Sequence, residues 1–352
     1  MKRKRREKTE NVIDAPDHLF PTGCTLLNCV LSDNAFRGCR KGTIINVVGD
    51  SSAGKSILAF TILAAIAAEP MYKNYRLIHD DAECGEAFNV EKLFGKKLAK
   101  RIEAPAYDSN NEEMHSETVQ DFHMFVKDAV EAERPFIYIL DSWDSVDSEE
   151  DQKKIDEDRK LWKKGKKLSG TYGTAKAKQA STILRNIRSD IKKTESLVII
   201  ISQVRENLNA MAFGSKKTRS GGKALKHYSW QEIWLFLGKK ERKNELQIGV
   251  NTIIKVEKNR ENGKLRNTQT VIFYDLGIDD VKSNIDWLIA NGEIKKQKGK
   301  FYIKDLDIAA QKADLIEYIE KNNLEIQLQK IVHRKWNEIE DSVKLHRKAR
   351  FS

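Results

Sequence analysis

One stretch near the start of the chain constrains the possible folds more than any other. A mostly apolar run at residues 44–48 leads directly into eight residues, 49–56, that read GDSSAGKS. A segment rich in Ala, Ile and Leu, with helical character, follows at once. This order predicts a strand, a glycine-rich loop and a helix, in that sequence.

The eight residues 49–56 match the pattern G-x-x-x-x-G-K-[S/T], in which backbone N–H groups at a helix N-terminus hold a polyphosphate. Gly49 and Gly54 let the backbone come close, Lys55 places a charge on the β- and γ-phosphates, and the Ser56 hydroxyl is a Mg²⁺ ligand. The pattern also occurs by chance, but here it has the required strand and helix on its two sides. The expected nucleotide contacts are Gly49, Asp50, Ser51, Ser52, Ala53, Gly54, Lys55, Ser56 and Ile57.

Strands are also predicted at 233–237, 248–256 and 268–274, and three others, earlier in the chain, each end in polar residues. The run 75–79 ends in Asp80-Asp81-Ala82-Glu83, the run 136–140 ends in Asp141, and the run 197–201 delivers Ser202 and Gln203. The carboxyl ends of parallel strands meet at one edge of a sheet, where ligands bind. Asp141 fits the role of supporting Mg²⁺, and Gln203 can hydrogen-bond a γ-phosphate or an attacking water. We expect an α/β fold, with a mostly parallel central sheet flanked by helices.

Composition limits the class of protein and the class of partner. The 352 residues carry a formal net charge of +11, which favours a polyanionic partner, although a basic solvated surface gives the same number. The four cysteines lack metal-ligand spacing, and no apolar run reaches about 18 residues, so we expect a cytoplasmic protein without a zinc site, disulfides or a membrane span. Residues 1–16 are expected to be a mobile basic arm, either solvated or touching DNA.

Two segments are candidates for contacts with nucleic acid. Residues 147–170 are rich in charged side chains and predict a surface loop at about 147–173, in which Trp162 lies among lysines. An aromatic residue among basic ones suits single-stranded nucleic acid, but a plain solvated loop is as good an interpretation. Residues 205–222 are rich in Gly, Ser and Lys and have little periodicity, which predicts a second, functional loop.

The chain changes character near residue 278. Helices are predicted at 284–290 and 308–320, and a short strand is predicted at 301–303. We therefore expect a core at 17–277 and a small C-terminal α+β domain at 278–352 that ends in a basic helical tail.

Five stretches together resemble the RecA family of homologous-recombination ATPases, especially its bacterial and phage members. In order they read PTGCTLLN, GDSSAGKS, DDAE, LDS and SQVRENLNAMAFGSKKTRSGGKALKHY, and a sixth, KVEKNR at 255–260, resembles the family's intersubunit segment. The resemblance covers roughly residues 20–305. It implies a RecA-like P-loop NTPase core that uses ATP and Mg²⁺ and hydrolyses ATP in a DNA-dependent manner. It also implies a homo-oligomeric helical filament on single-stranded DNA that pairs with double-stranded DNA and exchanges strands.

The resemblance also implies roles for individual residues. Glu83 would be the general base, Gln203 the γ-phosphate sensor, and Lys258 and Arg260 would reach the phosphates of a neighbouring subunit's ATP. The loops at 147–173 and 205–222 would bind DNA, with Phe213 as a wedge between bases. The implied DNA contacts are Arg205, Met211, Phe213, Lys216, Lys217, Arg219, Gly221, Gly222, Lys226 and Trp162.

The chain departs from the family pattern at several points. The segment before Val12 is shorter than the family's N-terminal polymerisation helix, and Phe88 is a guess for the residue that stacks on adenine. His227 stands where bacterial members have an aromatic, and the tail at 344–350 is basic where theirs is acidic. Two alternatives to a recombinase stay open: a ring-forming helicase or translocase, and a mediator or filament protein that binds ATP and hardly hydrolyses it.

Overall fold

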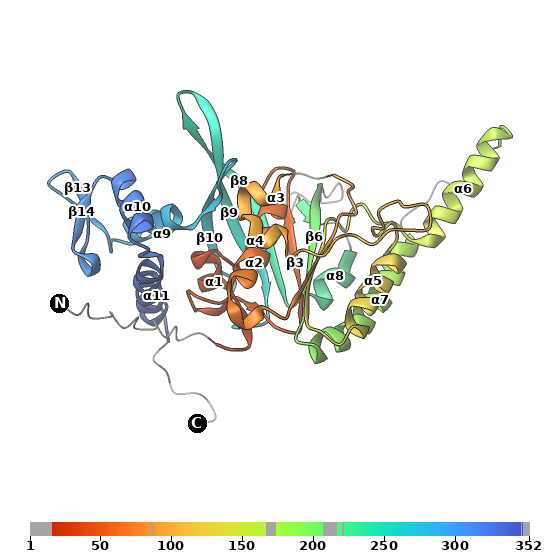
Figure 1. The fold of residues 1–352 in the computed structure, drawn as a ribbon, viewed down its shortest axis with the longest axis horizontal. Coiled ribbons are helices and arrows are strands. Elements are labelled where there is room, and N and C mark those ends of the chain that lie inside the picture. The colour runs from red at the N-terminus through yellow and green to blue at the C-terminus, as the bar shows by residue number, and fades with distance from the viewer. Residues whose placement is uncertain are drawn as a thin grey trace, which may run out of the picture.

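The computed structural model describes residues 16–85, 88–166, 174–206, 217–219, 222–345 and 347. Its centre is a nine-stranded sheet in the order β11-β10-β9-β8-β3-β6-β5-β4, with β7 paired to β6 (Figure 1). The strands are β3 (Thr43–Gly49), β4 (Arg76–Asp80), β5 (Phe136–Leu140), β6 (Leu197–Glu206), β7 (Lys217–Arg219), β8 (Gln231–Lys243), β9 (Leu246–Asn259), β10 (Asn267–Phe273) and β11 (Gly277–Asp279).

The pairing is parallel from β4 through β5, β6 and β3 to β8, and antiparallel from β8 through β9 and β10 to β11. All residues of β3 and β5 are buried, as expected for parallel strands that are covered on both faces. The expected α/β fold is confirmed.

Alternate residues of the central strands pack into two separate cores. Ile45, Ile139 and Ile199 face one core, with α1 (Thr25–Ser32) and α2 (Lys55–Ala68). The residues next to them in the sequence face the second core, which also contains side chains of α5 (Val119–Glu131), α7 (Thr174–Lys193) and α8 (Gly222–Tyr228). Successive side chains on a strand point to opposite faces, so each strand supplies both cores. The sheet is thereby held rigidly, with its carboxyl edge available for a ligand.

Short elements complete the N-terminal part. A two-stranded sheet joins β1 (Leu19–Phe20) to β2 (Cys39–Arg40), and a 3-10 turn, η1 (Pro70–Tyr72), follows α2. Two short helices, α3 (Val90–Phe94) and α4 (Lys96–Ala99), follow β4. The expected arm at residues 1–16 lies outside the described residues, except for Pro16.

The charged segment expected as a loop contains a helix, α6 (Glu149–Lys163), which extends away from the rest of the molecule (Figure 1). That part of the prediction is wrong. Ser148 accepts a hydrogen bond from the Asp151 N–H, three acidic residues occupy the first turn, and lysines occupy the last turn. Capping and opposite charges at the two ends of the helix dipole stabilise a helix that has little apolar periodicity.

The second expected loop is also shorter than predicted. β6 continues to Glu206 and pairs with β7, so that Arg205 lies opposite Thr218. Helix α8 begins at Gly222. The sequence of residues 205–222 shows no alternation of apolar and polar residues, so periodicity could not predict this pairing.

The chain from residue 278 onwards forms α9 (Asp280–Ala290), β12 (Lys295–Gln297), β13 (Lys300–Ile303), the 3-10 turn η2 (Lys304–Leu306), β14 (Ile308–Ala310), α10 (Lys312–Lys321) and α11 (Glu325–Ser342). Residues 308–310, expected to be helical, form β14 instead. The left-handed backbone of Asp307, with φ of 50°, turns the chain so that β14 pairs with β13. Leu328 and Val332 of α11 join the same core as α1.

Among the described residues, no helix is long and apolar enough to cross a membrane.

Candidate functional site

The predicted phosphate loop lies between β3 and α2. Gly54 has a φ of 91°, and a Cβ atom built there would lie 2.4 Å from Cδ1 of Ile272, so only glycine fits. Thr252 donates a hydrogen bond to the Ala53 carbonyl at 3.2 Å, which fixes the loop to β9. The first turn of α2 has no side-chain cap and no acidic residue. Its N–H groups are therefore available to an anion.

The residues expected to hold Mg²⁺ contact each other. The Ser56 hydroxyl donates to Oδ2 of Asp141 at 2.6 Å. Burial raises the pKa of Asp141, the Ser56 hydrogen bond opposes this, and the nearby Glu83 adds to the increase. Among the described residues, no three His, Cys, Asp or Glu side chains could hold a metal ion by themselves. One hydroxyl and one carboxylate fit Mg²⁺, which commonly takes its remaining ligands from phosphate and water.

The structure brings Glu83 and Gln203 together from different strands. Oε1 of Glu83 accepts hydrogen bonds from the Ser142 hydroxyl at 2.5 Å and from the Gln203 amide at 3.3 Å. The Glu83 N–H also donates to the Asp141 carbonyl at 3.0 Å. Sequence reasoning missed Ser142, although it directly follows Asp141 in the LDS stretch. The cluster places a carboxylate and an amide beside the end of the phosphate loop, where they can bind a water molecule.

Lys55 lies among carboxylates and folds back over the loop. Its Nζ donates to the Asp50 carbonyl at 2.9 Å. Burial lowers the pKa of Lys55, and Asp141, Glu83, Asp144 and Asp50 oppose this. Sequence reasoning missed Asp144, whose Oδ2 accepts the Gln203 N–H at 2.7 Å. The carboxylates of these four acids would repel the negative charge of a triphosphate. The site therefore favours a triphosphate that binds together with a cation over one that binds alone.

Lys258 and Arg260 lie beside the first residues of β8, toward the amino end of β3, whereas the phosphate loop follows the carboxyl end of β3. Gly49 pairs with Leu235 of β8, whereas Asn259 pairs with Gln231. Gln231 precedes Leu235 by roughly 13 Å along β8, at about 3.3 Å per residue. Both cations bind the end of α8: Lys258 Nζ donates to the Lys226 and His227 carbonyls, and Arg260 donates to His227 at 3.1 Å. The chain does not bring these cations to its own phosphate loop.

Phe88 is partly buried in an aromatic cluster. Its ring meets Phe60 edge-to-face at 5.1 Å and lies 6.0 Å from Phe94. A cavity of about 1130 Å³ opens beside Phe60 and Phe88 and extends to Ser56 and Asp141. The contact with Phe60 occupies part of the Phe88 surface, and Phe88 stays a guess for the residue that stacks on adenine.

The residues expected to contact DNA are only partly described. The Trp162 side chain is 69% exposed near the end of α6, and Lys226 is exposed in the last turn of α8, which Gly222 begins. Arg205 lies on β6, and Lys217 and Arg219 lie on β7. Met211, Phe213, Lys216 and Gly221 lie outside the described residues.

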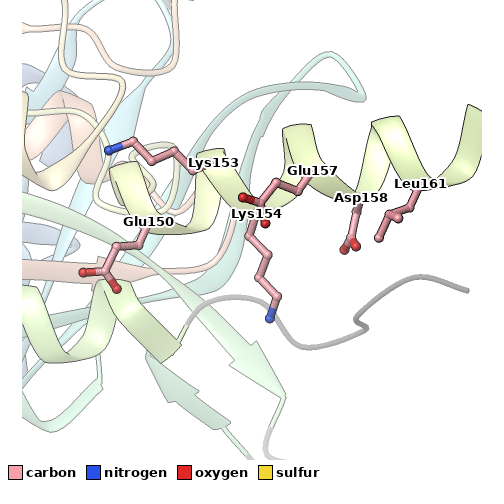
Figure 2. Close-up of a pocket in the computed structure, with 6 residues that line it drawn as sticks. All are labelled: Glu150, Lys153, Lys154, Glu157, Asp158 and Leu161. Atoms are coloured by element: carbon pink, nitrogen blue, oxygen red, sulfur yellow. The ribbon is translucent and has the colours of Figure 1, made fainter.

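Helix α6 carries both signs of charge along its length. Figure 2 shows both acidic and basic side chains beside a hollow, which has a volume of about 440 Å³. The lining residues are Glu150, Lys153, Lys154, Glu157, Asp158 and Leu161. This surface is not uniformly basic, so a contact with nucleic acid on α6 would depend on its last turn, where Trp162 and Lys163 lie.

Comparison with known proteins gives consistent matches. A family model described as the RecA N-terminal domain matches residues 165–279. The chain is 26% identical over 297 residues to Protein RecA of Malacoplasma penetrans (strain HF-2), covering 84% of this chain and 82% of that protein. It is 26% identical over 309 residues to Protein RecA of Mycoplasma mobile, covering 86% and 83% of the two chains. Protein RecA of Ureaplasma parvum serovar 3 is 32% identical over 149 residues, or 42% and 44% of the two chains. By these matches and by its α/β fold, the chain is similar to proteins of the RecA family over most of its length.

Proposed function

We propose that this protein is an ATP-dependent DNA recombinase. It forms helical filaments on single-stranded DNA, pairs that DNA with a homologous duplex and exchanges the strands. In this proposal residues 17–277 are the ATPase core, and residues 278–352 are a C-terminal domain. The observation that carries the proposal is the position of Gln203: it contacts Glu83 and lies on β6, the strand that leads into the segment 207–216.

Hydrolysis would use the residues that meet at the carboxyl edge of the sheet. The α2 N-terminus and Lys55 bind the phosphates, and Ser56 and Asp141 hold Mg²⁺, which neutralises phosphate charge when bound. Glu83 orients the attacking water and accepts its proton. Ser142 and Gln203 keep the Glu83 carboxylate in place through their hydrogen bonds.

The neighbouring subunit would complete the site. Lys258 and Arg260 lie beside the first residues of β8, away from the phosphate loop that follows the carboxyl end of β3, so we infer that they serve another copy's nucleotide in a head-to-tail assembly. A repeating interface of this kind that does not close gives a helical filament. ATP binding would then couple filament assembly to DNA binding, because Gln203 and α8 flank the predicted DNA loop.

Measuring DNA-stimulated phosphate release tests the enzyme assignment. We expect Lys55→Ala to lower turnover by about a hundredfold or more, because a preorganised positive charge on the phosphates is removed. Lys73→Ala, at an exposed position after η1, serves as the matched control and should behave as the wild type. Normal turnover in Lys55→Ala would refute the site.

A strand-exchange assay between circular single-stranded DNA and a homologous linear duplex tests the recombinase assignment. The wild-type protein should form joint molecules with ATP. Translocation-coupled duplex unwinding by closed rings would instead indicate a helicase, and ATP binding without turnover would indicate a mediator.

A further inference from the structure

Glu261 lies at the centre of a polar cluster next to the Lys258–Arg260 segment. Arg40 on β2 donates to both carboxylate oxygens, at 3.1 and 3.0 Å. The Trp230 indole N–H donates to Oε2 at 3.2 Å, and Nε2 of His18 lies 3.0 Å from Oε1. These partners come from three separate parts of the chain, and the Glu261 side chain is only 10% exposed. A carboxylate with this many donors is held in one orientation.

The cluster is stabilised by charge and by ring packing. Burial alone would raise the pKa of Glu261, but the hydrogen bonds from Arg40 and His18 hold it below its usual value. The Arg40 guanidinium also lies over the Trp230 ring, 5.2 Å from its centre. Loss of the carboxylate would leave Arg40 and the Trp230 N–H without this acceptor, so the cluster depends on Glu261.

The backbone on both sides of Arg260 is anchored. The Arg260 N–H donates to the Trp230 carbonyl at 3.1 Å, and the Glu261 N–H donates to the Asn259 side chain at 3.1 Å. Asn259 is buried and donates to the Leu31 carbonyl at 3.0 Å. Arg260 is therefore an exposed cation between two fixed neighbours, and its backbone has little freedom to move.

We propose that Glu261 is a positioning residue for the cations that complete a neighbouring subunit's nucleotide site. It ties the Arg260 backbone to β2 and to Trp230, so that Arg260 and Lys258 are held in one place beside the end of α8. Glu261 itself touches no nucleotide. The inference rests on the proposed site shared between subunits. It also means that the β1–β2 region, through Arg40, contributes to hydrolysis.

The test is complementation between two inactive variants. Glu261→Ala keeps its own phosphate loop, and we expect its DNA-stimulated kcat to fall by about 10- to 100-fold, because the cations are misplaced. Lys55→Ala has a damaged phosphate loop but intact cations. In a random equimolar mixture, roughly a quarter of the interfaces join an intact loop to intact cations, so about a quarter of wild-type turnover should return.

Arg260→Ala mixed with Lys55→Ala is the reference pair. If that pair does not complement, the shared site is absent and the proposed function fails. If it complements and Glu261→Ala does not, the role of Glu261 is overturned. Wild-type turnover in Glu261→Ala alone also overturns it.

Two further variants separate positioning from folding. Glu69→Ala breaks a comparable ion pair with Arg37 elsewhere in the fold and should keep its turnover. Glu261→Gln keeps the size and one acceptor oxygen of the side chain. It should lose part of its kcat, keep its KM for ATP, and regain turnover with Lys55→Ala; failure to regain it contradicts the proposal.

Discussion

At the scale of single residues, the candidate nucleotide site depends on contacts between distant parts of the chain. Glu83 and Ser142 are 59 residues apart, and Glu83 and Gln203 are 120 apart, yet all three share hydrogen bonds. Glu83 lies shortly after β4, Ser142 lies shortly after β5, and Gln203 lies within β6; these three parallel strands are neighbours in the sheet. The strand order therefore assembles the cluster, and no local segment contains it.

Replacing Glu83 with Gln tests the general-base role. The amide keeps the shape and an acceptor oxygen for Ser142, but it cannot take a proton from water. We expect turnover to fall by about 10²- to 10⁴-fold while nucleotide affinity stays close to that of the wild type. Steady-state phosphate release and equilibrium nucleotide binding measure the two quantities.

Glu91→Gln is a suitable control for Glu83→Gln, because Glu91 is an exposed acid on α3 that pairs with Lys96. If Glu83→Gln hydrolyses ATP at the wild-type rate, the base must be another group. Asp144, whose carboxylate also lies near Lys55, would be the next residue to replace.

The sequence alone predicted residues with a local signature and missed those that depend on distant partners. The phosphate loop, Asp141 and Gln203 stand out because each follows an apolar strand. Glu261 has no such signature: its partner Arg40 is 221 residues away, and only the folded sheet brings them together. Asp144 was missed for the same reason, because its bond to Gln203 spans 59 residues.

At the scale of secondary-structure elements, α11 is attached to the turn between β9 and β10 by a buried acid. Glu340 accepts hydrogen bonds from Arg266 at 2.8 and 2.9 Å and from Lys264 at 2.7 Å. Trp336 adds a bond from its indole N–H to Asp33 at 3.1 Å. These contacts join the last helix to α1 and to the hairpin that carries Lys258 and Arg260.

The Glu340 attachment should depend on pH. Hydrogen bonds from Arg266 and then Lys264 lower the pKa of Glu340 below its ordinary value of 4.5, although burial opposes them. Because the folded-state pKa is the lower one, the stabilisation is complete above the ordinary value and is lost as the pH falls through the folded-state value. At pH 7, Glu340→Gln should lower the free energy of unfolding by about 1 kcal/mol.

Urea unfolding of the wild type and Glu340→Gln at several pH values measures this effect. The difference between the two proteins should shrink as the pH falls below 4.5. Glu338→Gln, an exposed acid on the same helix, provides the control and should show little difference at any pH. A constant difference between the wild type and Glu340→Gln across the pH range would contradict the assigned ion pairs.

Elements with a buried face were predicted well, and elements without one were not. β3, β5 and the start of β6 are apolar runs covered on both sides. The ends of β8 and β9 rise beyond the sheet as an exposed hairpin (Figure 1), and the predicted strands stopped short of them. In α6, end charges and a cap stabilise the helix, and these features resemble those of a charged loop.

At the scale of the whole molecule, the phosphate loop follows the carboxyl end of β3, whereas the candidate cations lie beside the first residues of β8, toward the amino end of β3. In the proposed function, a single subunit carries half of each of two sites. The proposal requires neighbours related head to tail, and the predicted DNA segment, 205–222, lies between Gln203 and α8. It predicts that nucleotide binding, assembly and DNA binding are one coupled event, in which each subunit's hydrolysis depends on the next.

Electron microscopy of the protein with single-stranded DNA and a slowly hydrolysed ATP analogue tests this coupling most directly. We predict regular helical filaments when both are present, and none when either is omitted or when Lys55→Ala is used. Closed rings, or single subunits that ignore DNA with and without the nucleotide, would contradict the account.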